Sequence, residues 1–495
     1  MADNRHISQN ELEKYLWGAA VLLRGYIDAS DYKQYIFPLL YFKRICDCYD
    51  EETEKAIEEV GEVFPEDHRF TVPEGSHWDD VRAVTENVGL SIQHAMRSIE
   101  EANREQLQGI FGDTTWTNKN FLSDATLREL IEHFSSQTLS IERVPQDELG
   151  QGYEYLIKKF ADDSGHTAAE FYTNRTLVRL MTQMLKPKEG ESIYDPTCGS
   201  AGMLLVAALQ VKEEGGDYRT LKLYGQEINL ITSSIGRMNM FLHGIDDFKI
   251  IRGDTLSNPA FVENDCLKTF DMVLANPPYS ISKWNREAFS SDKWGRNMFG
   301  VPPQGRADYA FFQHIIKSMD PETGRCAILF PHGVLFRDAE KEMRKKLIEA
   351  DLIECVLGLG PNLFYNSPMF SCVVICKTQK PKKRQGKVIF IDAQKEVTKS
   401  KTQSFIESHH RKRILNGYQR YEDIDGFSKV MKNEEILAQN GNLSVQMYVK
   451  PLNGNESEEE ISLNELIAEW DEKCEDFGAS IEDLISILKE VGMHE

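Results

Sequence analysis

The spacing of hydrophobic and polar positions changes near residue 150. In residues 11–27 and 32–50, apolar side chains recur every three or four positions, which is the period of an amphipathic helix. The same spacing returns around Ile92 and around Leu127, and glycine is sparse throughout this region. The pattern therefore predicts an α-helical N-terminal domain over residues 1–150.

Between about residues 165 and 390, short apolar runs replace this spacing, and helical segments separate many of them. The runs are ESIYDP, LKLYGQEI, FKIIRGD, FDMVLANPP, RCAILFP, DLIECVLGL, FSCVVICK and KVIFIDA. Such alternation is typical of an α/β fold with a mostly parallel sheet and helices on both faces. We expect this domain to cover residues 151–425. Ligands of such sheets bind beyond the carboxyl ends of the strands.

After about residue 430 the chain turns acidic and helical. The segments NELIAEWDEKCEDF and SIEDLISILKEVG carry apolar residues at helical spacing among many carboxylates. We expect a helical C-terminal tail over residues 426–495. Two interpretations stay open: a helix that packs on its own domain, or one that docks onto a partner protein.

Composition narrows the class of protein. No run of about 18 apolar residues is present and the first residues are polar, which predicts a cytoplasmic protein without a membrane span. The nine cysteines form no framework with nearby histidines, so no metal site is expected. Proteins that grip nucleic acid alone usually carry a strongly basic face, whereas this chain has a net charge of −22. Either its ligand is not a nucleic acid, or a partner protein supplies most of the affinity for the nucleic acid.

The sharpest chemical signal is the tetrapeptide Asn276, Pro277, Pro278 and Tyr279, directly after the apolar run FDMVLA. The prolines make the turn rigid and remove two N–H donors, so the turn presents carbonyl oxygens. Methylation of the exocyclic amine of adenine is difficult, because the lone pair is delocalised into the ring and the nitrogen is a poor nucleophile. Two hydrogen-bond acceptors on the two hydrogens of this amine would hold it near tetrahedral geometry. Asn276 and Pro277 offer two oxygens, and the Tyr279 ring can stack on a base taken out of the duplex. A rigid turn that only caps a strand is the alternative.

A second signal follows the run ESIY, where Asp195 leads into a turn of small residues and then a helix. Such a turn lets the backbone approach a ligand at a helix N-terminus, and it suits a nucleoside with a charged amino-acid tail. Glu227 and Asp254 end the next two predicted strands, placed for ribose hydroxyls and for an adenine amine. The candidate binding residues are Asp195, Thr197, Gly199, Ser200, Ala201, Gly202, Glu227 and Asp254. A plain strand–helix turn with capping acids is the alternative.

A third group lies before the first predicted strand, in the segment HTAAEFYT. Phe171 is a candidate for packing on the methionine part of a cofactor, and Thr173 for a hydrogen bond to its carboxylate. The remaining candidates in the segment are His166, Thr167, Ala168, Ala169 and Glu170. Taken alone, this segment is only the start of a helix.

Residues 281–306 form a long segment in which cations alternate with large aromatic side chains. They are Lys283, Arg286, Lys293, Arg296 and Arg306, with Trp284, Trp294 and Phe299. This combination suits a mobile loop that closes on a nucleic acid strand. A long loop without secondary structure is usually either functional or disordered.

Taken together, these motifs resemble the S-adenosylmethionine-dependent amino-methyltransferases, and most closely the modification subunits of type I restriction–modification systems. The resemblance rests on the order AAEFYT, DPTCGSAG, GQEIN, GDTL, ANPPYS, GRADYAFF, ILFPHGVLFR and FYNSPMFSCVVICK. It implies a Rossmann-like methyltransferase fold and a site-specific DNA adenine-N6 methyltransferase that acts on a flipped adenine. Two positions depart from the family pattern, with Asn174 in place of a proline and Ala169 in place of a glycine.

The resemblance also implies roles and partners. Asn276 and Tyr279 would be catalytic, and segment 166–171 would line an S-adenosylmethionine pocket with Asp195, Ser200, Ala201, Gly202 and Glu227. The partners would be DNA, a specificity subunit that binds two modification subunits and, in complexes that cleave, a restriction subunit. A specificity subunit that reads DNA would explain the acidic charge. The alternatives are a protein glutamine N5-methyltransferase, a non-catalytic assembly subunit and a cytosine-N4 target.

Overall fold

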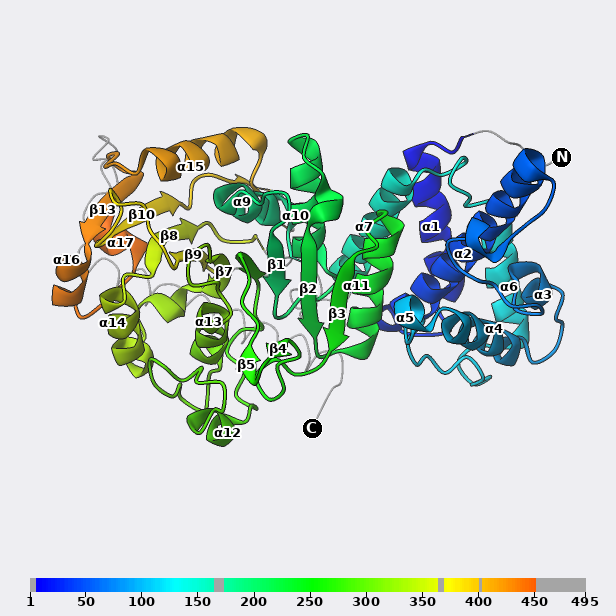
Figure 1. Cartoon of the computed structure of the whole chain (residues 1–495), viewed down its shortest axis with the longest axis horizontal. Helices are drawn as coiled ribbons and strands as arrows, with labels where there is room; N and C mark the ends of the chain where they lie inside the picture. Colours follow the sequence, from blue (N-terminus) through cyan, green and yellow to red (C-terminus); the bar gives the residue numbers. More distant parts are fainter. Residues whose placement is uncertain (1–5, 164–172, 364–368, 400–402, 451–495) are drawn as a thin grey trace, which may run out of the picture. The chain divides into compact units, whose positions relative to one another are not determined.

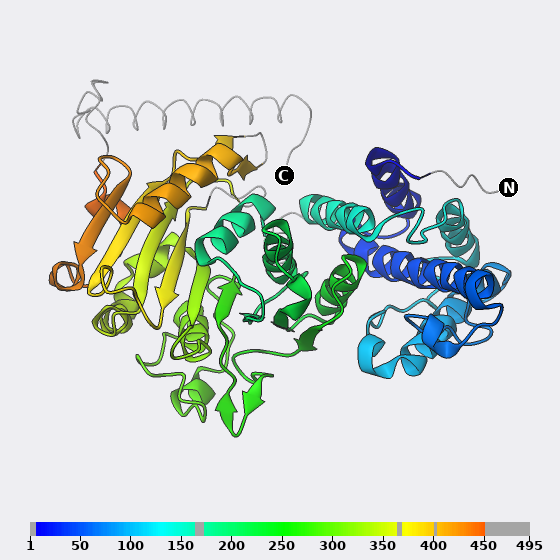
Figure 2. The same ribbon diagram turned by 45° about the horizontal axis from the view of Figure 1, so that its top comes forward.

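The computed structural model describes residues 6–163, 173–363, 369–399 and 403–450 (Figures 1 and 2). Helices fill the first of these ranges, and a nine-stranded sheet with its covering helices is built from the others. The predicted fold class, an α/β methyltransferase fold preceded by a helical domain, is confirmed. In the part of the chain that the structure describes, no helix has the length and apolar character needed to cross a membrane.

The helices before the sheet bury their apolar faces in one shared cluster. Ile36, Ile92 and Leu130, each from a different helix, are fully buried in it. The helices are α1 (Gln9–Leu23), α2 (Tyr32–Val60), α3 (Trp78–Arg82), α4 (Val88–Ala102), α5 (Arg104–Leu107), α6 (Asp124–Ser135) and α7 (Gln146–Asp163). Because apolar positions at helical spacing face one side, these amphipathic helices are stable mainly through packing on one another.

The central sheet has the strand order β13-β10-β8-β9-β7-β6-β1-β2-β3. Its strands are β1 (Ser192–Asp195), β2 (Lys222–Glu227), β3 (Phe248–Arg252), β6 (Met272–Ala275), β7 (Arg325–Pro331), β8 (Ile353–Leu359), β9 (Ser371–Lys377), β10 (Lys387–Ala393) and β13 (Ser428–Lys432). Five neighbouring pairs are parallel, while β9 is antiparallel to both its neighbours and β13 to β10. Every apolar run quoted from the sequence forms one of these strands.

Helices cover both faces of this sheet, as Figure 2 shows for α9, α10 and α15 against α13 and α14. Two apolar clusters fill the space between the sheet and these two layers. The helices are α9 (Arg175–Leu185), α10 (Gly202–Glu213), α11 (Leu230–Leu242), α12 (Arg286–Ser290), α13 (Asp308–Lys317), α14 (Lys341–Glu349), α15 (Ser408–Arg420), α16 (Asn433–Ala438) and α17 (Val445–Tyr448). Two small hairpins pair β4 (Val262–Glu263) with β5 (Cys266–Leu267) and β11 (Thr398–Lys399) with β12 (Ser404–Phe405).

The helical region and the sheet region share core residues along α11. The hydroxyl of Tyr153 on α7 donates to the carbonyl of Ile235 on α11 at 3.1 Å. Arg237, also on α11, donates to the carbonyls of Gln106 and Gln108, each at 2.6 Å. Helix α7 therefore spans the expected boundary at residue 150 and packs with the N-terminal helices.

The sheet continues past residue 425, where the α/β domain was expected to end. Strand β13 (Ser428–Lys432) pairs with β10, and Ile436 and Val445 are buried in the same cluster as α13 and α14. The run SKVMK carries no long apolar stretch because an edge strand has one neighbour and is only partly buried. Most of the expected tail, residues 451–495, lies outside the described residues.

Candidate active site

Asn276 lies at the carboxyl edge of the sheet, as predicted, because it directly follows β6, a strand buried at all four positions. Its side-chain nitrogen Nδ2 donates to the Oγ1 of Thr173 at 3.1 Å. Its side-chain oxygen Oδ1 is buried and has no hydrogen-bond partner among the described residues. A buried acceptor without a donor costs free energy, so it indicates a place where a ligand donor belongs.

The turn after β1 forms the second part of the site. Asp195 is 2% exposed, and its Oδ1 accepts the backbone N–H of Thr197 at 3.0 Å. Burial raises the pKa of Asp195 to about 8, with the nearby Glu227 adding to the rise and the Thr197 hydrogen bond opposing it. Gly199 and Ala201 have φ values of +53° and +61°, so the turn closes tightly before α10 begins. The site therefore contains a buried carboxyl that a cationic ligand would ionise.

Glu227 is the last residue of β2, whereas Asp254 lies two residues beyond the end of β3, and both already accept hydrogen bonds from the protein. The Glu227 carboxylate accepts the backbone N–H of Gly199 at 3.0 Å and that of Asn229 at 2.8 Å. Asp254 accepts the N–H of Leu256 at 2.9 Å and the hydroxyl of Ser257 at 2.7 Å. Glu227 thus holds the turn after β1 through Gly199, while Asp254 caps the turn formed by the residues that follow it.

One pocket brings together seven of the thirteen candidates that lie among the described residues. It is lined by Thr173, Arg175, Asp195, Thr197, Cys198, Gly199, Ser200, Gly202, Met203 and Asn276. Seven of these were candidates from the sequence, and Arg175, Cys198 and Met203 were not. Six other described candidates do not line it: Ala201, Glu227, Asp254, Pro277, Pro278 and Tyr279. The segment that contains His166, Thr167, Ala168, Ala169, Glu170 and Phe171 lies outside the described residues.

A partly buried ion pair between Arg175, which lines this pocket, and Glu154 supports the turn after β1. Arg175 donates from Nη2 to Oε1 of Glu154 at 2.8 Å, and Asn239 donates to the same oxygen at 2.8 Å. Asn239 also donates to the carbonyl of Ser200 at 2.9 Å, which ties the ion pair to the turn. Burial alone would raise the pKa of Glu154, but the Arg175 guanidinium holds this pKa below its ordinary value. Glu154 is thus a charged anchor, and no local motif in the sequence indicated it.

The departure at Asn174 has a structural explanation. Asn174 is 3% exposed and caps α9, because its Oδ1 accepts the N–H of Thr176 at 3.0 Å. Its Nδ2 donates to the carbonyls of Leu363 at 3.3 Å and Ser404 at 3.0 Å. A proline could begin the helix here but could not make these bonds. The asparagine therefore links the start of α9 to the segment after β8 and to β12.

Tyr279 is half-buried and packs against the apolar cluster on the α9 and α10 side of the sheet. Burial raises the pKa of the Tyr279 phenol well above its ordinary value, with Cys372 and Asp308 adding to the rise. The phenol is therefore neutral at physiological pH and is not a base. Its ring can serve as a flat apolar surface, which is the role that the sequence suggested.

The cationic segment 281–306 is more ordered than the sequence indicated. It contains α12, and the indole nitrogen of Trp284 donates to the carbonyl of Gln304 at 2.9 Å. The expectation that Arg296 faces a nucleic acid strand is wrong, because Arg296 is 1% exposed. Its guanidinium pairs with Asp292 at 2.7 Å and donates to the carbonyls of Thr255 and Leu256. The other four cations of the segment, Lys283, Arg286, Lys293 and Arg306, are exposed.

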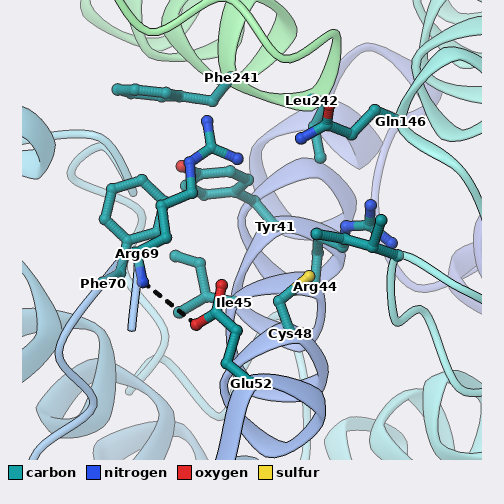
Figure 3. A pocket seen from close by; sticks show the side chains of 11 residues that line it. Tyr41, Arg44, Ile45, Cys48, Glu52, Arg69, Phe70, Gln146, Phe241 and Leu242 are labelled. Carbon is teal, nitrogen blue, oxygen red and sulfur yellow. Dashed lines mark hydrogen bonds between the residues drawn. The ribbon is translucent and has the colours of Figure 1, made fainter. Parts of the chain in front are cut away.

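Another pocket lies where the helical region meets α11 (Figure 3). The guanidinium of Arg69 lies between the rings of Tyr41 and Phe241, and the backbone N–H of Arg69 donates to Glu52 at 3.1 Å. None of the candidate site residues lines this pocket. It therefore belongs to the packing of the two regions and not to the site around Asn276.

Comparison with known proteins identifies the family. The N-6 DNA Methylase family matches residues 144–458, and the HsdM N-terminal domain matches residues 12–134. The chain belongs to the N-6 DNA methylase family. It is a DNA adenine-N6 methyltransferase of the kind found as modification subunits of type I restriction–modification systems.

Individual relatives agree with this membership. The type I restriction enzyme MjaVIII methylase subunit of Methanocaldococcus jannaschii is 30% identical over 98% of this chain and 85% of its own length. The HindI methylase subunit of Haemophilus influenzae is 31% identical over 73% of this chain and 83% of its own length. Among solved structures, the type I methyltransferase subunit from Streptococcus thermophilus matches 90% of this chain and 100% of its own, with a TM-score of 0.78 and 29% identity.

Proposed function

We propose that this chain transfers a methyl group from S-adenosylmethionine to N6 of an adenine flipped out of DNA, with Asn276, Pro277, Pro278 and Tyr279 as its catalytic tetrapeptide. The observation that carries the proposal is the buried Oδ1 of Asn276, which has no partner among the described residues and borders the same pocket as Asp195. An amine substrate donates hydrogen bonds, so it requires a free acceptor close to the turn after β1 that would hold the cofactor.

The catalytic roles follow from the hydrogen-bonding capacity of each group. Thr173 occupies Nδ2 of Asn276, so the amide directs its oxygen, and not its nitrogen, toward a substrate amine. The carbonyl of Pro277 supplies the second acceptor, and Pro278 keeps it in place because proline restricts the backbone. Together the two oxygens draw the amine toward tetrahedral geometry and stabilise the positive charge that develops on nitrogen. After methyl transfer the nitrogen carries a positive charge, and this cation is acidic enough to release its proton to water.

The residues of the pocket fit S-adenosylmethionine. This group supplies an electrophilic methyl on a sulfonium, and it carries a nucleoside and a charged amino-acid end. Gly199, Ser200, Ala201 and Gly202 form the tight turn that lets the backbone approach it, with Thr197 beside them. The buried Asp195 suits a cationic ligand, because positive charge nearby favours its ionised form. We assign Thr173 and segment 166–171 to the amino-acid end, Glu227 to the ribose and Asp254 to the adenine.

DNA recognition is proposed to depend on partners. The chain carries 79 acidic and 57 basic residues, so its net charge repels a polyanion. We propose that a specificity subunit reads the DNA sequence, binds two copies of this chain and contacts the tail that follows the sheet domain, residues 451–495. A restriction subunit joins where the complex also cleaves. Lys283, Arg286, Lys293 and Arg306 then provide local phosphate contacts near the flipped base.

The test is methylation by the full chain co-expressed with its specificity subunit. Asn276→Ala should abolish formation of N6-methyladenine, measured by mass spectrometry of DNA nucleosides. The same variant should bind S-adenosylmethionine within about fivefold of wild type in calorimetry, because one hydrogen bond of about 1 kcal/mol is the most it can remove. Asn416→Ala, which changes an exposed asparagine of α15 outside the pocket and outside segment 281–306, is the matched control and should retain activity. N6-methyladenine at wild-type levels in Asn276→Ala would refute the catalytic assignment.

A further inference from the structure

Asp308, the first residue of α13, holds the backbone directly behind the catalytic tetrapeptide. Its Oδ1 accepts the backbone N–H of Ser280 at 3.0 Å, and Ser280 follows Tyr279 in sequence. One residue further, the carbonyl of Ile281 accepts the N–H of Ala307 at 3.1 Å. The chain that leaves the tetrapeptide is therefore attached to the start of α13 at two successive points.

Ser280 needs this attachment because its backbone is strained. Its φ is +52°, in the left-handed region that residues other than glycine adopt at a cost of roughly 1–2 kcal/mol. Such a conformation persists where surrounding contacts enforce it. Ser280 is exposed, and the contact that meets its N–H is the carboxylate of Asp308, which is only 1% exposed. The direction in which the tetrapeptide leaves β6 thus depends on a buried side chain of α13.

The other oxygen of Asp308 is fixed by Arg337. The Nη2 of Arg337 donates to Oδ2 of Asp308 at 2.7 Å, and its Nε donates to Oε2 of Glu340 at 2.9 Å. Glu340 is fully buried. Arg337 therefore connects two buried carboxylates, one through Nε and the other through Nη2. A buried pair of this kind adds little net stability but fixes geometry, because either partner left alone would be an uncompensated charge.

The positions of these residues in the sheet explain why they meet. β6 and β7 are parallel neighbours in register, with Ala275 beside Ile328. Asn276 follows β6, and Arg337 lies in the segment that follows β7, so both emerge at the same edge. Asp308 stands between them. The motifs GRADYAFF and ILFPHGVLFR, to which the cofactor site assigns no role, supply these two side chains.

We propose that Asp308 and Arg337 form a brace that positions the catalytic tetrapeptide for methyl transfer. The inference rests on the proposed function of Asn276. Neither residue lines the pocket assigned to the cofactor. The brace acts on the orientation of Pro277, Pro278 and Tyr279 through Ser280, so it affects the rate of transfer and leaves cofactor affinity unchanged. Asp308 and Arg337 are positioning residues, and the reacting atoms touch neither.

The experiment compares Asp308→Ala, Asp308→Asn and Arg337→Lys in the full chain with its specificity subunit. Misplacing a reacting group by about 1 Å can cost about 100-fold in rate, so Asp308→Ala should lower the single-turnover rate by about 10- to 100-fold. Arg337→Lys keeps the charge but offers one donor group in place of two, and its rate should lie between Asp308→Ala and wild type. The Kd for S-adenosylmethionine should stay within about twofold in every variant, since the brace makes no contact in the pocket.

Glu191→Gln is the matched control for a merely structural effect. Glu191 pairs with Arg325 at 2.7 Å, and this ion pair is also largely buried but lies at the amino end of β7, on the opposite edge of the sheet. Glu191→Gln should lower the melting temperature about as much as the Asp308 variants do, while leaving the single-turnover rate within about twofold of wild type. Combining Asp308→Ala with Arg337→Ala should cost no more rate than the worse single change, because the two residues act as one unit.

Each outcome decides the matter. A single-turnover rate for Asp308→Ala within about threefold of wild type, or an equal loss in Glu191→Gln, overturns the brace. If Asp308→Ala does not fold, Asp308→Asn and Arg337→Lys decide together: the asparagine can still accept the N–H of Ser280 but offers no charge to Arg337, so wild-type rates in both variants overturn the brace. If Asn276→Ala is inactive but the Asp308 variants are fully active, the brace is refuted and the proposed function stands. Active Asn276→Ala would remove the proposed function itself.

Discussion

Asn276 and Thr173 meet at the carboxyl edge of the sheet, where Nδ2 of Asn276 donates to Oγ1 of Thr173 at 3.1 Å. The two residues are 103 positions apart in sequence. Their hydrogen bond decides which end of the amide is left for a substrate, because it occupies the nitrogen and leaves the oxygen. A side chain that we assign to the cofactor's amino-acid end thus also orients the asparagine that we propose as catalytic.

Thr173→Val should slow methyl transfer by removing this restraint. Valine keeps the branched shape of threonine but has no oxygen, so the Asn276 amide is free to rotate. Losing one hydrogen bond of about 1 kcal/mol predicts a fall of about 5- to 10-fold in the single-turnover rate. Thr173→Ser retains an acceptor and should stay within about twofold. Equal rates for the valine and serine variants would show that Thr173 does not orient Asn276.

Asp195 should make the stability of the ligand-free chain depend on pH. Its pKa is about 8 in the folded chain because of burial, with Glu227 adding to the rise, whereas an unfolded aspartate titrates near pH 3.9. Between these two values the folded chain holds one proton more than the unfolded chain. The free energy of unfolding therefore falls as pH rises from about 4 to about 8. Thermal melting between pH 6 and pH 8 should show this fall for wild type but not for Asp195→Asn.

The same carboxyl should couple cofactor binding to proton release. A cationic ligand in the pocket favours ionised Asp195, so the affinity for S-adenosylmethionine should increase from pH 6 to pH 8. Calorimetry in two buffers of different ionisation enthalpy would detect the released proton. In Asp195→Asn both the pH dependence and the proton release should disappear. A wild-type affinity that is constant from pH 6 to pH 8 would contradict this coupling.

How much of this site the sequence could predict depends on the range of each contact. Asn276 and Asp195 were found because each follows an apolar run, and parallel strands end at a common edge. Glu154 and Arg175 were missed because their ion pair joins residues 21 positions apart, and helix α7 carries no motif that relates Glu154 to the turn. Long-range pairs of this kind have no local periodicity that would reveal them.

The charge of a residue in the sequence was the least reliable guide to its partners in the fold. Arg296 is one of five cations in segment 281–306, and nothing in its immediate neighbourhood distinguishes it from Arg306, which is exposed. Its burial follows from acceptors on another segment, the carbonyls of Thr255 and Leu256. Similarly, Asp254 follows a strand end with no sign that Ser257 would occupy its carboxylate. Hydrophobic spacing predicts where the backbone goes, but the partners of polar groups depend on the assembled fold.

The cations of segment 281–306 should separate into two classes by mutation. Lys283→Gln and Arg306→Gln change exposed side chains, and each should reduce the slope of log affinity against log salt by about 1 in DNA binding by the complex. Arg296→Gln should instead leave the buried Asp292 without its partner and destabilise the chain by about 3–5 kcal/mol. Salt titrations of DNA affinity and thermal melts measure the two effects. An unchanged salt slope in Lys283→Gln and Arg306→Gln would argue against DNA contact by this segment.

Phe241→Ala should uncouple the helical region from the sheet region. Phe241 on α11 is 4% exposed, and its ring centroid lies 6.2 Å from that of Tyr41, 5.7 Å from Phe70 and 4.9 Å from Phe248 (Figure 3 shows the first two). Truncating a buried phenylalanine typically costs about 3–5 kcal/mol. Because Tyr41 and Phe70 belong to the helical region and Phe248 to β3, most of this loss should weaken the packing between the two regions.

Urea unfolding followed by circular dichroism and by tryptophan fluorescence should therefore change from coincident curves in wild type to separate ones in Phe241→Ala. Phe134→Ala is the control, because Phe134 is fully buried within the helical region itself. This control should destabilise the helical region by a similar amount without loosening its contact with α11, so its two curves should stay coincident. Separate curves in both variants would mean that the two regions already unfold independently, and that the packing around Phe241 does not couple them.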